Sequence, residues 1–336
     1  MSVCPDEFGL IARYFAPLAR SFPGAYGLID DAAVICPSPG AELVLKTDVI
    51  VGGVDFPDGT APDLVGRKAL RVNLSDLAAK GTVPRAYLLD LVLPDTVDEP
   101  WIAAFAAGLA RDQAEYRIAL IGGDLSSTSG PVVVGVTAIG EAPIGRTVRR
   151  GGARPDDVIF VTGTIGDAAL GLGVTQGALP ALESSAADFL RDRYRLPRPR
   201  VALGPELPGL ATASIDVSDG LLADLRHLSE VCGLDALIEA GCVPLSPAAR
   251  AVIAGDPRHL ATALTGGDDY EIIFTAPPDA SARIGALSQA LGIPIHAIGR
   301  MGRSRAVANP QLVVLDADGR PMAFTSEGWT HFGAHP

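Results

Sequence analysis

Short runs of β-branched and apolar residues alternate along this 336-residue chain with longer segments that have the apolar spacing of helices. The strand-like runs are residues 42–47, 86–93, 118–121, 132–139, 158–162, 213–215, 271–275, 295–298 and 312–315. The helical segments are residues 7–16, 63–80, 99–115, 167–175, 220–231 and 280–291. This alternation predicts α/β or α+β domains rather than an all-β sandwich or a helical bundle.

The length of the chain favours two domains, since a domain has roughly 150 residues. The best boundary is the stretch of residues 140–157, which is dense in Gly, Pro and Arg and has no apolar period. We therefore expect an N-terminal domain of residues 1–147 and a C-terminal domain of residues 148–336. Because only 5% of the residues are aromatic, the cores should consist mostly of aliphatic side chains.

The chain is acidic, with 39 Asp and Glu against 27 Lys and Arg and a formal charge of −12. Such a protein is poorly suited to bind a polyanion over a wide face, so we expect neither nucleic acid nor an anionic membrane as partner. Lysine occurs only at positions 46, 68 and 80, and none of the three belongs to a G-K-[ST] step. The sequence therefore lacks a Walker A loop, and any bound phosphates must be neutralised in another way.

Several features predict a soluble cytoplasmic protein. The four cysteines lack metal-ligand spacing, which favours free thiols in a reducing compartment. The first residues lack the basic and apolar regions of a signal peptide, and no run of about 18 apolar residues predicts a membrane span. The five histidines also lack ligand spacing, so we do not expect zinc.

Carboxylates follow several predicted strands at the point where each strand ends. These residues are Asp48, Asp124, Asp216 and Asp219, together with Asp30 and Asp31 after a glycine-containing turn. In open α/β sheets, ligands bind outside the carboxyl ends of strands, so these acids are candidates for one cleft. Like charges in a cleft repel unless a cation offsets them, and Mg²⁺ is the natural partner of oxygen ligands. Each Asp taken alone could equally be a turn former or a helix N-cap.

Other features point to phosphate. The glycine-rich segments 122–124 and 162–167 could let a backbone approach a phosphate, and either could be only a tight turn. The arginines of the interdomain stretch could bind phosphate or belong to a solvated linker.

Asp76 lies four residues before Lys80 in a predicted helix, so an ion pair is its simplest interpretation. The residues together indicate a Mg²⁺-dependent phosphoryl transfer enzyme.

Ten motifs connect these features in one order along the chain. They are EFGLIARYFAP at 7–17, DDAAV at 30–34, KTDVIVGGVDF at 46–56, KALRVNLSDLAAKG at 68–81, LIGGD at 120–124, RRGGARPDD at 149–157, VTGTIGDAALGL at 161–172, SIDVSDGLLAD at 214–224, GGDDYEIIF at 266–274 and EGWTHF at 327–332. In these motifs the chain resembles the thiamine-monophosphate kinases, a family of the superfamily that includes aminoimidazole ribonucleotide synthetase and selenophosphate synthetase.

The resemblance implies ATP-dependent phosphorylation of thiamine monophosphate to thiamine diphosphate by direct in-line transfer with Mg²⁺. It also implies two α/β domains like those of aminoimidazole ribonucleotide synthetase. The N-terminal domain would bind ATP and Mg²⁺ and form a homodimer in which the sheets of two copies combine. Because the acceptor is a phosphate that is already anionic, the reaction needs no strong general base.

The motif matches also imply roles for single residues. The metal ligands would be Asp31, Thr47, Asp48, Asp76, Asp124, Asp216 and Asp219. Contacts to ATP would come from Thr47, Gly123, Asp124, Arg150 and Ser218. The catalytic residues would be Asp31, Asp124 and Asp216. Asp55, Asp268 and Trp329 would contact the thiamine substrate, where a tryptophan face suits a cationic thiazolium. Without the resemblance, core packing is the simpler interpretation of Trp329.

The chain departs from the family pattern at Ile29, Lys46, Asp55 and Asp268, where Gly, Ser or Thr, His and Glu are usual. Lys46 places a cation beside the proposed metal site, where it could replace part of a metal's charge or contact a phosphate. Two other functions stay open. The chain could be another ATP-dependent enzyme of the superfamily, such as a ribonucleotide cyclo-ligase, or a non-catalytic nucleotide-binding module. The segments EFGLIARYF and GWTHF favour the kinase over its sister enzymes.

Overall fold

The computed structural model describes residues 6–304, 306, 309–326 and 328–329. Of the closing EGWTHF motif, Gly328 and Trp329 are described and the other four residues lie outside this range. The chain divides into two compact units. The N-terminal unit holds the described residues up to Leu77 together with Thr82–Gly145. The C-terminal unit holds Ala78–Gly81 and the described residues from Arg146 onward.

The N-terminal unit is built on a four-stranded sheet. Its strands are β1 (Ala41–Val51), β4 (Val133–Pro143), β2 (Val83–Pro94) and β3 (Ala119–Thr128), in the order β1-β4-β2-β3. β4 pairs antiparallel with β1 and β2, whereas β2 and β3 are parallel. β1 and β3 are therefore the two edges of this sheet.

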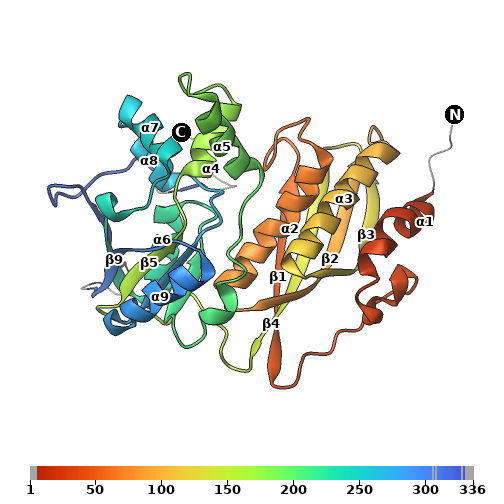
Figure 1. The fold of residues 1–336 in the computed structure, drawn as a ribbon, viewed down its shortest axis with the longest axis horizontal. Helices are drawn as coiled ribbons and strands as arrows, with labels where there is room; N and C mark the ends of the chain where they lie inside the picture. Colours follow the sequence, from red (N-terminus) through yellow and green to blue (C-terminus); the bar gives the residue numbers. More distant parts are fainter. Residues whose placement is uncertain (1–5, 305, 307–308, 327, 330–336) are drawn as a thin grey trace. The chain divides into compact units, whose positions relative to one another are not determined.

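Helices α2 (Pro62–Ala79) and α3 (Glu99–Tyr116) lie side by side over one face of the sheet (Figure 1). Two glycines allow this close approach: a Cβ added at Gly108 would lie 2.2 Å from the carbonyl oxygen of Asp63, and one at Gly66 would lie 2.9 Å from that of Phe105. α1 (Glu7–Leu10) leads into the short helical turns Ile11–Phe15, Ala16–Ala19 and Pro23–Leu28. Apolar residues of these turns pack against the sheet's other face.

The C-terminal unit is built on a six-stranded sheet in the order β10-β7-β9-β5-β8-β6. The strands are β5 (Val158–Thr162), β6 (Ala213–Asp216), β7 (Leu234–Glu239), β8 (Ile272–Ala276), β9 (Ile295–Arg303) and β10 (Leu312–Leu315). Only β10 and β7 pair in parallel. The helices are α4 (Asp167–Thr175), α5 (Ser184–Arg195), α6 (Leu221–Cys232), α7 (Pro247–Gly255), α8 (His259–Thr265) and α9 (Ser281–Leu291), with short turns at Gly204–Glu206, Ala240–Cys242 and Pro278–Ala280. The predicted α/β class is confirmed.

The element boundaries differ from the prediction in a way that bears on the site. β1 and β3 continue past their predicted ends, so Asp48 and Asp124 lie inside strands rather than after them. Exposed side chains such as Leu45 (63% exposed) and Val49 (56% exposed) alternate with half-buried ones along β1. This edge strand can therefore continue through the polar residues Thr47 and Asp48. Strand β7 and helices α5, α7 and α8 were not predicted from the sequence. Within the described residues, no helix is both long and apolar enough to cross a membrane.

Candidate functional site

Three charged side chains meet between β1 and α2 in the N-terminal unit. Lys46 and Asp48 are two residues apart on β1, so their side chains leave the same face of the strand. Asp76 reaches them from α2. The ammonium of Lys46 lies 3.1 Å from a carboxylate oxygen of Asp48 and 2.9 Å from one of Asp76. The structure therefore brings two predicted metal ligands together, with a lysine between them.

These contacts change the interpretation of Asp76. Its carboxylate pairs with Lys46, whereas the ammonium of Lys80 donates a 2.7 Å hydrogen bond to the carbonyl of Ser214. Burial alone would lower the pKa of Lys46, but Asp76 and Asp48 together outweigh burial and raise that pKa above its ordinary value. Burial raises the pKa of Asp48, although the Lys46 charge acts in the opposite direction.

Thr47 does not share this cluster through its side chain. It lies between Lys46 and Asp48 on β1, so its hydroxyl leaves the opposite face of the strand. There its Oγ1 lies 3.1 Å from the Oγ1 of Thr137, its register partner on β4. The predicted metal and ATP contacts of Thr47 consequently belong to the opposite face of the sheet from the lysine cluster.

A pocket in the same unit collects a second group of predicted ligands. Asp30, Asp31, Gly123 and Asp124 contribute to its lining, and most of the other lining residues are apolar. All three carboxylate side chains belong to exposed residues. Asp30 accepts a 2.8 Å hydrogen bond from the backbone N–H of Asp31, which orders the start of this acidic pair.

Position 123 requires a glycine because the neighbouring strand approaches it closely. Its φ is +150°, and a Cβ added there would lie 1.8 Å from the carbonyl oxygen of Leu89 on β2. No side chain fits at this distance. The close approach predicted for this glycine pair is therefore satisfied by protein backbone in the sheet, while Gly123 still lines the pocket beside Asp124.

Asp48 and Asp124 lie on opposite edge strands of one sheet. Strands β4 and β2 lie between them, so about 14 Å separates the two edges at a strand spacing of about 4.8 Å. Two oxygens bound to one Mg²⁺ can be only about 4 Å apart, because each lies about 2.1 Å from the ion. The N-terminal unit of a single chain therefore does not bring Asp48 and Asp124 to one metal ion.

The oxygen donors of these residues suit Mg²⁺, which prefers carboxylates, phosphates and water. Within the described part of the chain, however, no group of three acidic, His or Cys side chains lies close enough to hold a metal ion. The donor chemistry of these residues thus fits magnesium.

A turn in the C-terminal unit carries three more predicted residues. Asp216 ends β6 and is buried, and Ser218 and Asp219 follow it. One carboxylate oxygen of Asp224 accepts the backbone N–H groups of Ser218, Asp219 and Gly220 at 3.0, 3.0 and 3.2 Å. Burial and the nearby Asp219 raise the pKa of Asp224 to about 7, although the three N–H groups act against this shift. Asp224 therefore fixes the conformation of the turn.

The two predicted thiamine contacts of this unit are attached to the same turn. The N–H of Asp268 donates a 2.9 Å hydrogen bond to the carbonyl of Ser218, and the N–H of Trp329 donates one of 3.0 Å to that of Asp219. Asp268 has a φ of +71°. Trp329 is 51% exposed, so core packing does not explain this tryptophan. The structure therefore brings Ser218, Asp219, Asp268 and Trp329 to one place.

Arg150 is exposed, and its backbone lies beside strand β6. The carbonyl of the preceding residue, Arg149, accepts a 3.0 Å hydrogen bond from the N–H of Ser214 on β6. The arginine-rich stretch thus runs beside the strand that ends at Asp216. This placement is consistent with a side chain available to a ligand rather than one held in a core.

Asp55 has a structural contact in the N-terminal unit. Its carboxylate accepts a 2.7 Å hydrogen bond from the backbone N–H of Val51. Its carbonyl oxygen accepts one of 2.9 Å from the ammonium of Lys68, which is buried. These bonds hold the turn that follows β1, so the residue has a local reason to be aspartate.

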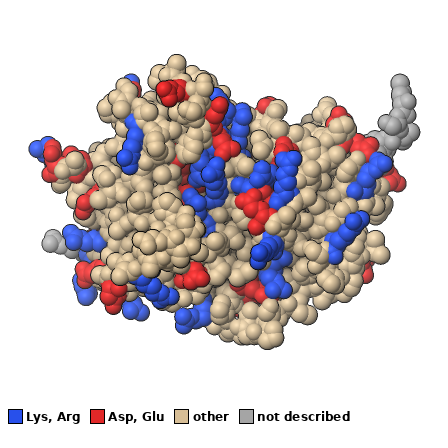
Figure 2. Space-filling model, in the orientation of Figure 1, with Lys and Arg blue, Asp and Glu red and all other residues tan. Residues whose placement is uncertain are grey.

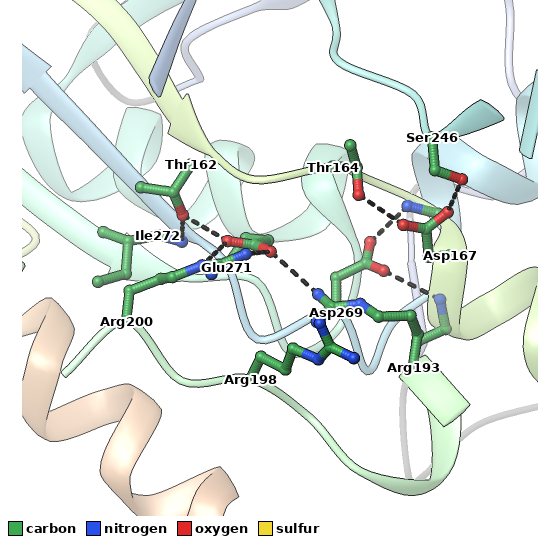
Figure 3. A network of polar contacts seen from close by, with 12 residues as sticks. Thr162, Thr164, Asp167, Arg193, Arg198, Arg200, Ser246, Asp269, Glu271 and Ile272 are labelled. Carbon is green, nitrogen blue, oxygen red and sulfur yellow. Dashed lines mark hydrogen bonds and ion pairs between the residues drawn. The ribbon is translucent and has the colours of Figure 1, made fainter. Parts of the chain in front are cut away.

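A buried polar network near α4 was not predicted (Figure 3). Asp269 accepts the N–H groups of Gly166 at 2.6 Å and Ala168 at 3.1 Å, and so caps α4 from another segment. Glu271 pairs with Arg193 and Arg200 and accepts the hydroxyl of Thr162 at 2.6 Å. The motifs TGTIGD and GGDDYE were visible in the sequence, but their mutual contact required the fold.

Comparisons with known proteins extend over most of the chain. The family model for the AIR synthase related protein, N-terminal domain, matches residues 29–142. A thiamine-monophosphate kinase of Caulobacter vibrioides is 41% identical over 330 residues, which cover 97% of this chain and 91% of that protein. The chain belongs to the thiamine-monophosphate kinase family.

Solved structures agree with membership of this family. A thiamine-monophosphate kinase of Stenotrophomonas maltophilia K279a is 40% identical, with a TM-score of 0.79, and the match covers 88% of this chain and 91% of that one. A second structure, AaThiL complexed with AMPPCP and TMP, is 30% identical with a TM-score of 0.76 and covers 92% of this chain and 97% of that one. The predicted family is therefore confirmed.

Proposed function

We propose that this chain transfers the terminal phosphoryl group of ATP to thiamine monophosphate and forms thiamine diphosphate and ADP. The observation that carries this function is the match to a thiamine-monophosphate kinase over 97% of the chain. A solved relative bears AMPPCP, an ATP analogue, together with TMP, which supports the same pair of substrates.

The residues suit direct in-line transfer. The attacking oxygen belongs to a phosphate that is already anionic near neutral pH, so no strong base is required. The work of the protein is to position two phosphate groups that repel one another and to offset their charge. We assign this role to Asp31, Asp124 and Asp216 together with the other predicted ligands.

Mg²⁺, when bound, would neutralise the phosphate oxygens during transfer. We propose that Asp31, Asp48, Asp76, Asp124, Asp216 and Asp219 hold these ions. Their oxygen donors suit magnesium, and their distribution over several elements suits a site that is completed by the phosphates. Thr47 lies in the same segment, and its hydroxyl faces away from Asp48, so we place any metal contact of this residue on another donor atom or another ion.

For the nucleotide, we propose contacts with Gly123, Asp124, Arg150 and Ser218, in addition to Thr47. Gly123 and Asp124 line the N-terminal pocket, which supports this assignment. Arg150 would supply a guanidinium fork, the geometry that matches a phosphate best. Ser218 belongs to the turn fixed by Asp224, which would hold its hydroxyl in a constant position.

For the thiamine portion, we propose contacts with Asp268 and Trp329. The exposed indole face can lie against a cationic thiazolium, and a nearby carboxylate favours the same charge. Asp55 remains a proposed substrate contact, and its hydrogen bond with Val51 leaves its second oxygen for that purpose.

We also propose a homodimer formed through the N-terminal unit. Exposed apolar side chains concentrate there: Phe8, Tyr26, Ile29, Val34, Leu45, Val49, Val54 and Ile144 are all exposed. If β3 of one copy approached β1 of another, Asp124 of the first would approach Asp48 of the second. This arrangement would supply the proximity that one chain lacks.

We propose that the reaction takes place in the cytoplasm, as the chemistry of the chain's thiols and surface suggests. Cys36, Cys232 and Cys242 are free, which suits a reducing compartment. Basic and acidic side chains are interspersed over the face that Figure 2 shows, an arrangement that suits small anionic substrates better than a long polyanion.

The substrate assignment is tested by ADP formation with and without thiamine monophosphate, at several Mg²⁺ concentrations. We expect ADP to form only when the acceptor and Mg²⁺ are both present. Equal ADP release without the acceptor would refute the assignment, and tight ATP binding without turnover would instead support a binding module.

The dimer is tested by mixing Asp48→Asn and Asp124→Asn variants, each nearly inactive alone. If every site takes one residue from each copy, random exchange makes half of the dimers mixed, each with one intact site. About a quarter of the wild-type activity should then return. No recovery after demonstrated subunit exchange would exclude a shared site.

A further inference from the structure

We propose that the ammonium group of Lys46 is a resident cation that takes the place of one divalent metal ion between Asp48 and Asp76. The inference rests on the proposed Mg²⁺-dependent function. The lysine nitrogen lies 3.1 Å from an oxygen of Asp48 and 2.9 Å from an oxygen of Asp76, so both carboxylates share it.

The charges explain why a cation is needed at this point. Two carboxylates that share a site repel one another, so a cation between them stabilises the pair. Lys46 reduces the charge of the group from −2 to −1 without a dissociable ion. The three side chains are between 13% and 37% exposed, so solvent screens the interaction only in part.

Geometry makes the lysine and a metal ion mutually exclusive in this position. An ammonium that donates to both carboxylates occupies the space between them. A Mg²⁺ ion at about 2.1 Å from the same oxygens would have to displace it and would then repel it at short range. The chain consequently binds one divalent ion fewer than its carboxylates alone would allow. Lys46 contacts one oxygen of each carboxylate, and the second oxygens of Asp48 and Asp76 are the ones proposed to hold the other ions.

The backbone of Lys46 is held in the sheet, which favours an ammonium that stays between the two carboxylates. Lys46 lies in the middle of β1 and is paired in register with Ala138 of β4. The backbone therefore holds the start of the side chain in a fixed place, and Asp48 leaves the same face of the strand. The alternative role, contact with a substrate phosphate, would require the ammonium to leave both carboxylates.

The test counts metal ions rather than turnover. Purified full-length protein is titrated with Mn²⁺, and free Mn²⁺ is measured by electron paramagnetic resonance, with and without a nonhydrolysable ATP analogue. We expect Lys46→Ser to bind one more Mn²⁺ per chain than the wild type. The same number of ions in both proteins would overturn the proposal.

Several variants separate this site from a general change of charge. Lys46→Arg keeps the cation and should bind as many ions as the wild type. Arg85→Ser removes one positive charge elsewhere in the same unit, where Arg85 pairs with Glu141 at 3.2 Å, and should add no ion. An additional ion in Arg85→Ser would show that net charge alone is responsible, and would overturn the proposal.

A double variant locates the additional ion. Lys46→Ser combined with Asp76→Asn removes one of the two carboxylates and should return the count to that of the wild type. If the additional ion persists, it binds elsewhere and the proposal fails. Lys46→Met, which keeps the aliphatic stem, serves in place of Lys46→Ser if the serine variant does not fold, as judged by circular dichroism.

The result is independent of the substrate assignment. If wild-type protein formed no ADP from ATP and thiamine monophosphate, the proposed function would fail, while the Mn²⁺ counts would still decide the role of Lys46. Conversely, a kinase with unchanged counts in Lys46→Ser would keep its function and lose the resident cation.

Discussion

The two units treat their carboxylates in different ways. In the N-terminal unit, Asp31 and Asp124 are exposed in a pocket, and Asp48 and Asp76 share a half-buried lysine. In the C-terminal unit, Asp224, Asp269 and Glu271 are almost completely buried and accept hydrogen bonds from backbone N–H groups, a hydroxyl and arginines.

The difference separates two uses of the same chemical group. A carboxylate that solvent can reach is available to cations and phosphates that come and go. A buried carboxylate must keep its partners, because an unpaired charge in the interior is costly. We therefore expect substitutions in the first set to affect turnover and substitutions in the second set to affect the fold or the shape of the site.

The largest effect should come from Glu271→Gln. The change removes the negative charge that pairs with Arg193 and Arg200, whose side chains are only 4% and 18% exposed. Breaking a buried pair by removing one partner costs about 3–5 kcal/mol, so the free energy of unfolding should fall by that amount. Urea unfolding followed by circular dichroism measures it.

Asp188→Asn is the matched control. Asp188 pairs with Arg191 at 2.7 Å on the surface of the same unit, where its side chain is 73% exposed. Exposed pairs contribute at most about 1 kcal/mol. If the two variants lost the same stability, burial of the Glu271 network would not be what makes it stabilising.

Asp124→Asn should reduce turnover by at least about 100-fold. Loss of a residue that only orients a metal ligand can already cost that much, and Asp124 is proposed to bind the metal directly. Its unfolding transition should not move, since the side chain is exposed. Asp90→Asn is the control, because Asp90 is exposed and is the register partner of Asp124 on β2. Comparable loss of activity in both variants would contradict a specific role for Asp124.

The comparison also shows what the sequence could predict. The alternation of strands and helices revealed the fold class. The helix predicted over residues 63–80 is present as α2 and buries Leu70, Leu74 and Leu77. Single Asp residues next to strands were recognisable as candidates. Their grouping was not, because β1 and β3 are opposite edges of a sheet and neither the strand order nor the partner of Asp76 can be read from local patterns.

Asp224 was missed for a related reason. It lies five residues after Asp219, at the start of α6, where an acidic residue is ordinarily explained by the helix N-terminus. Only the folded turn shows that one oxygen receives three consecutive N–H groups. The contact of Asp269 with Gly166 spans 103 residues and was equally inaccessible to local patterns.

Asp224→Asn tests whether a buried carboxylate can act on the site through position. An amide can still accept some of the three hydrogen bonds, so we expect a stability loss of about 1–2 kcal/mol. Because Asp268 and Trp329 are attached to this turn, the KM for thiamine monophosphate should rise several-fold while the KM for ATP changes less. Asp224→Ala should enlarge both effects. Loss of stability with unchanged KM values would leave Asp224 a structural residue only.

The last effect concerns pH and distinguishes the buried set directly. Burial raises the pKa of Asp269 well above its usual range, against the pull of the N–H groups of Gly166 and Ala168. The folded protein then binds a proton that the unfolded chain has already released, from about pH 4 upward. The stability that this group contributes is present below pH 4 and is lost as pH rises toward its folded pKa.

Wild-type unfolding free energy should therefore decline with pH more steeply than that of Asp269→Asn when both are measured from pH 5 to pH 8. Identical slopes would mean that Asp269 is ionised throughout this range, and the contrast between the two sets of carboxylates would then rest on burial and not on protonation.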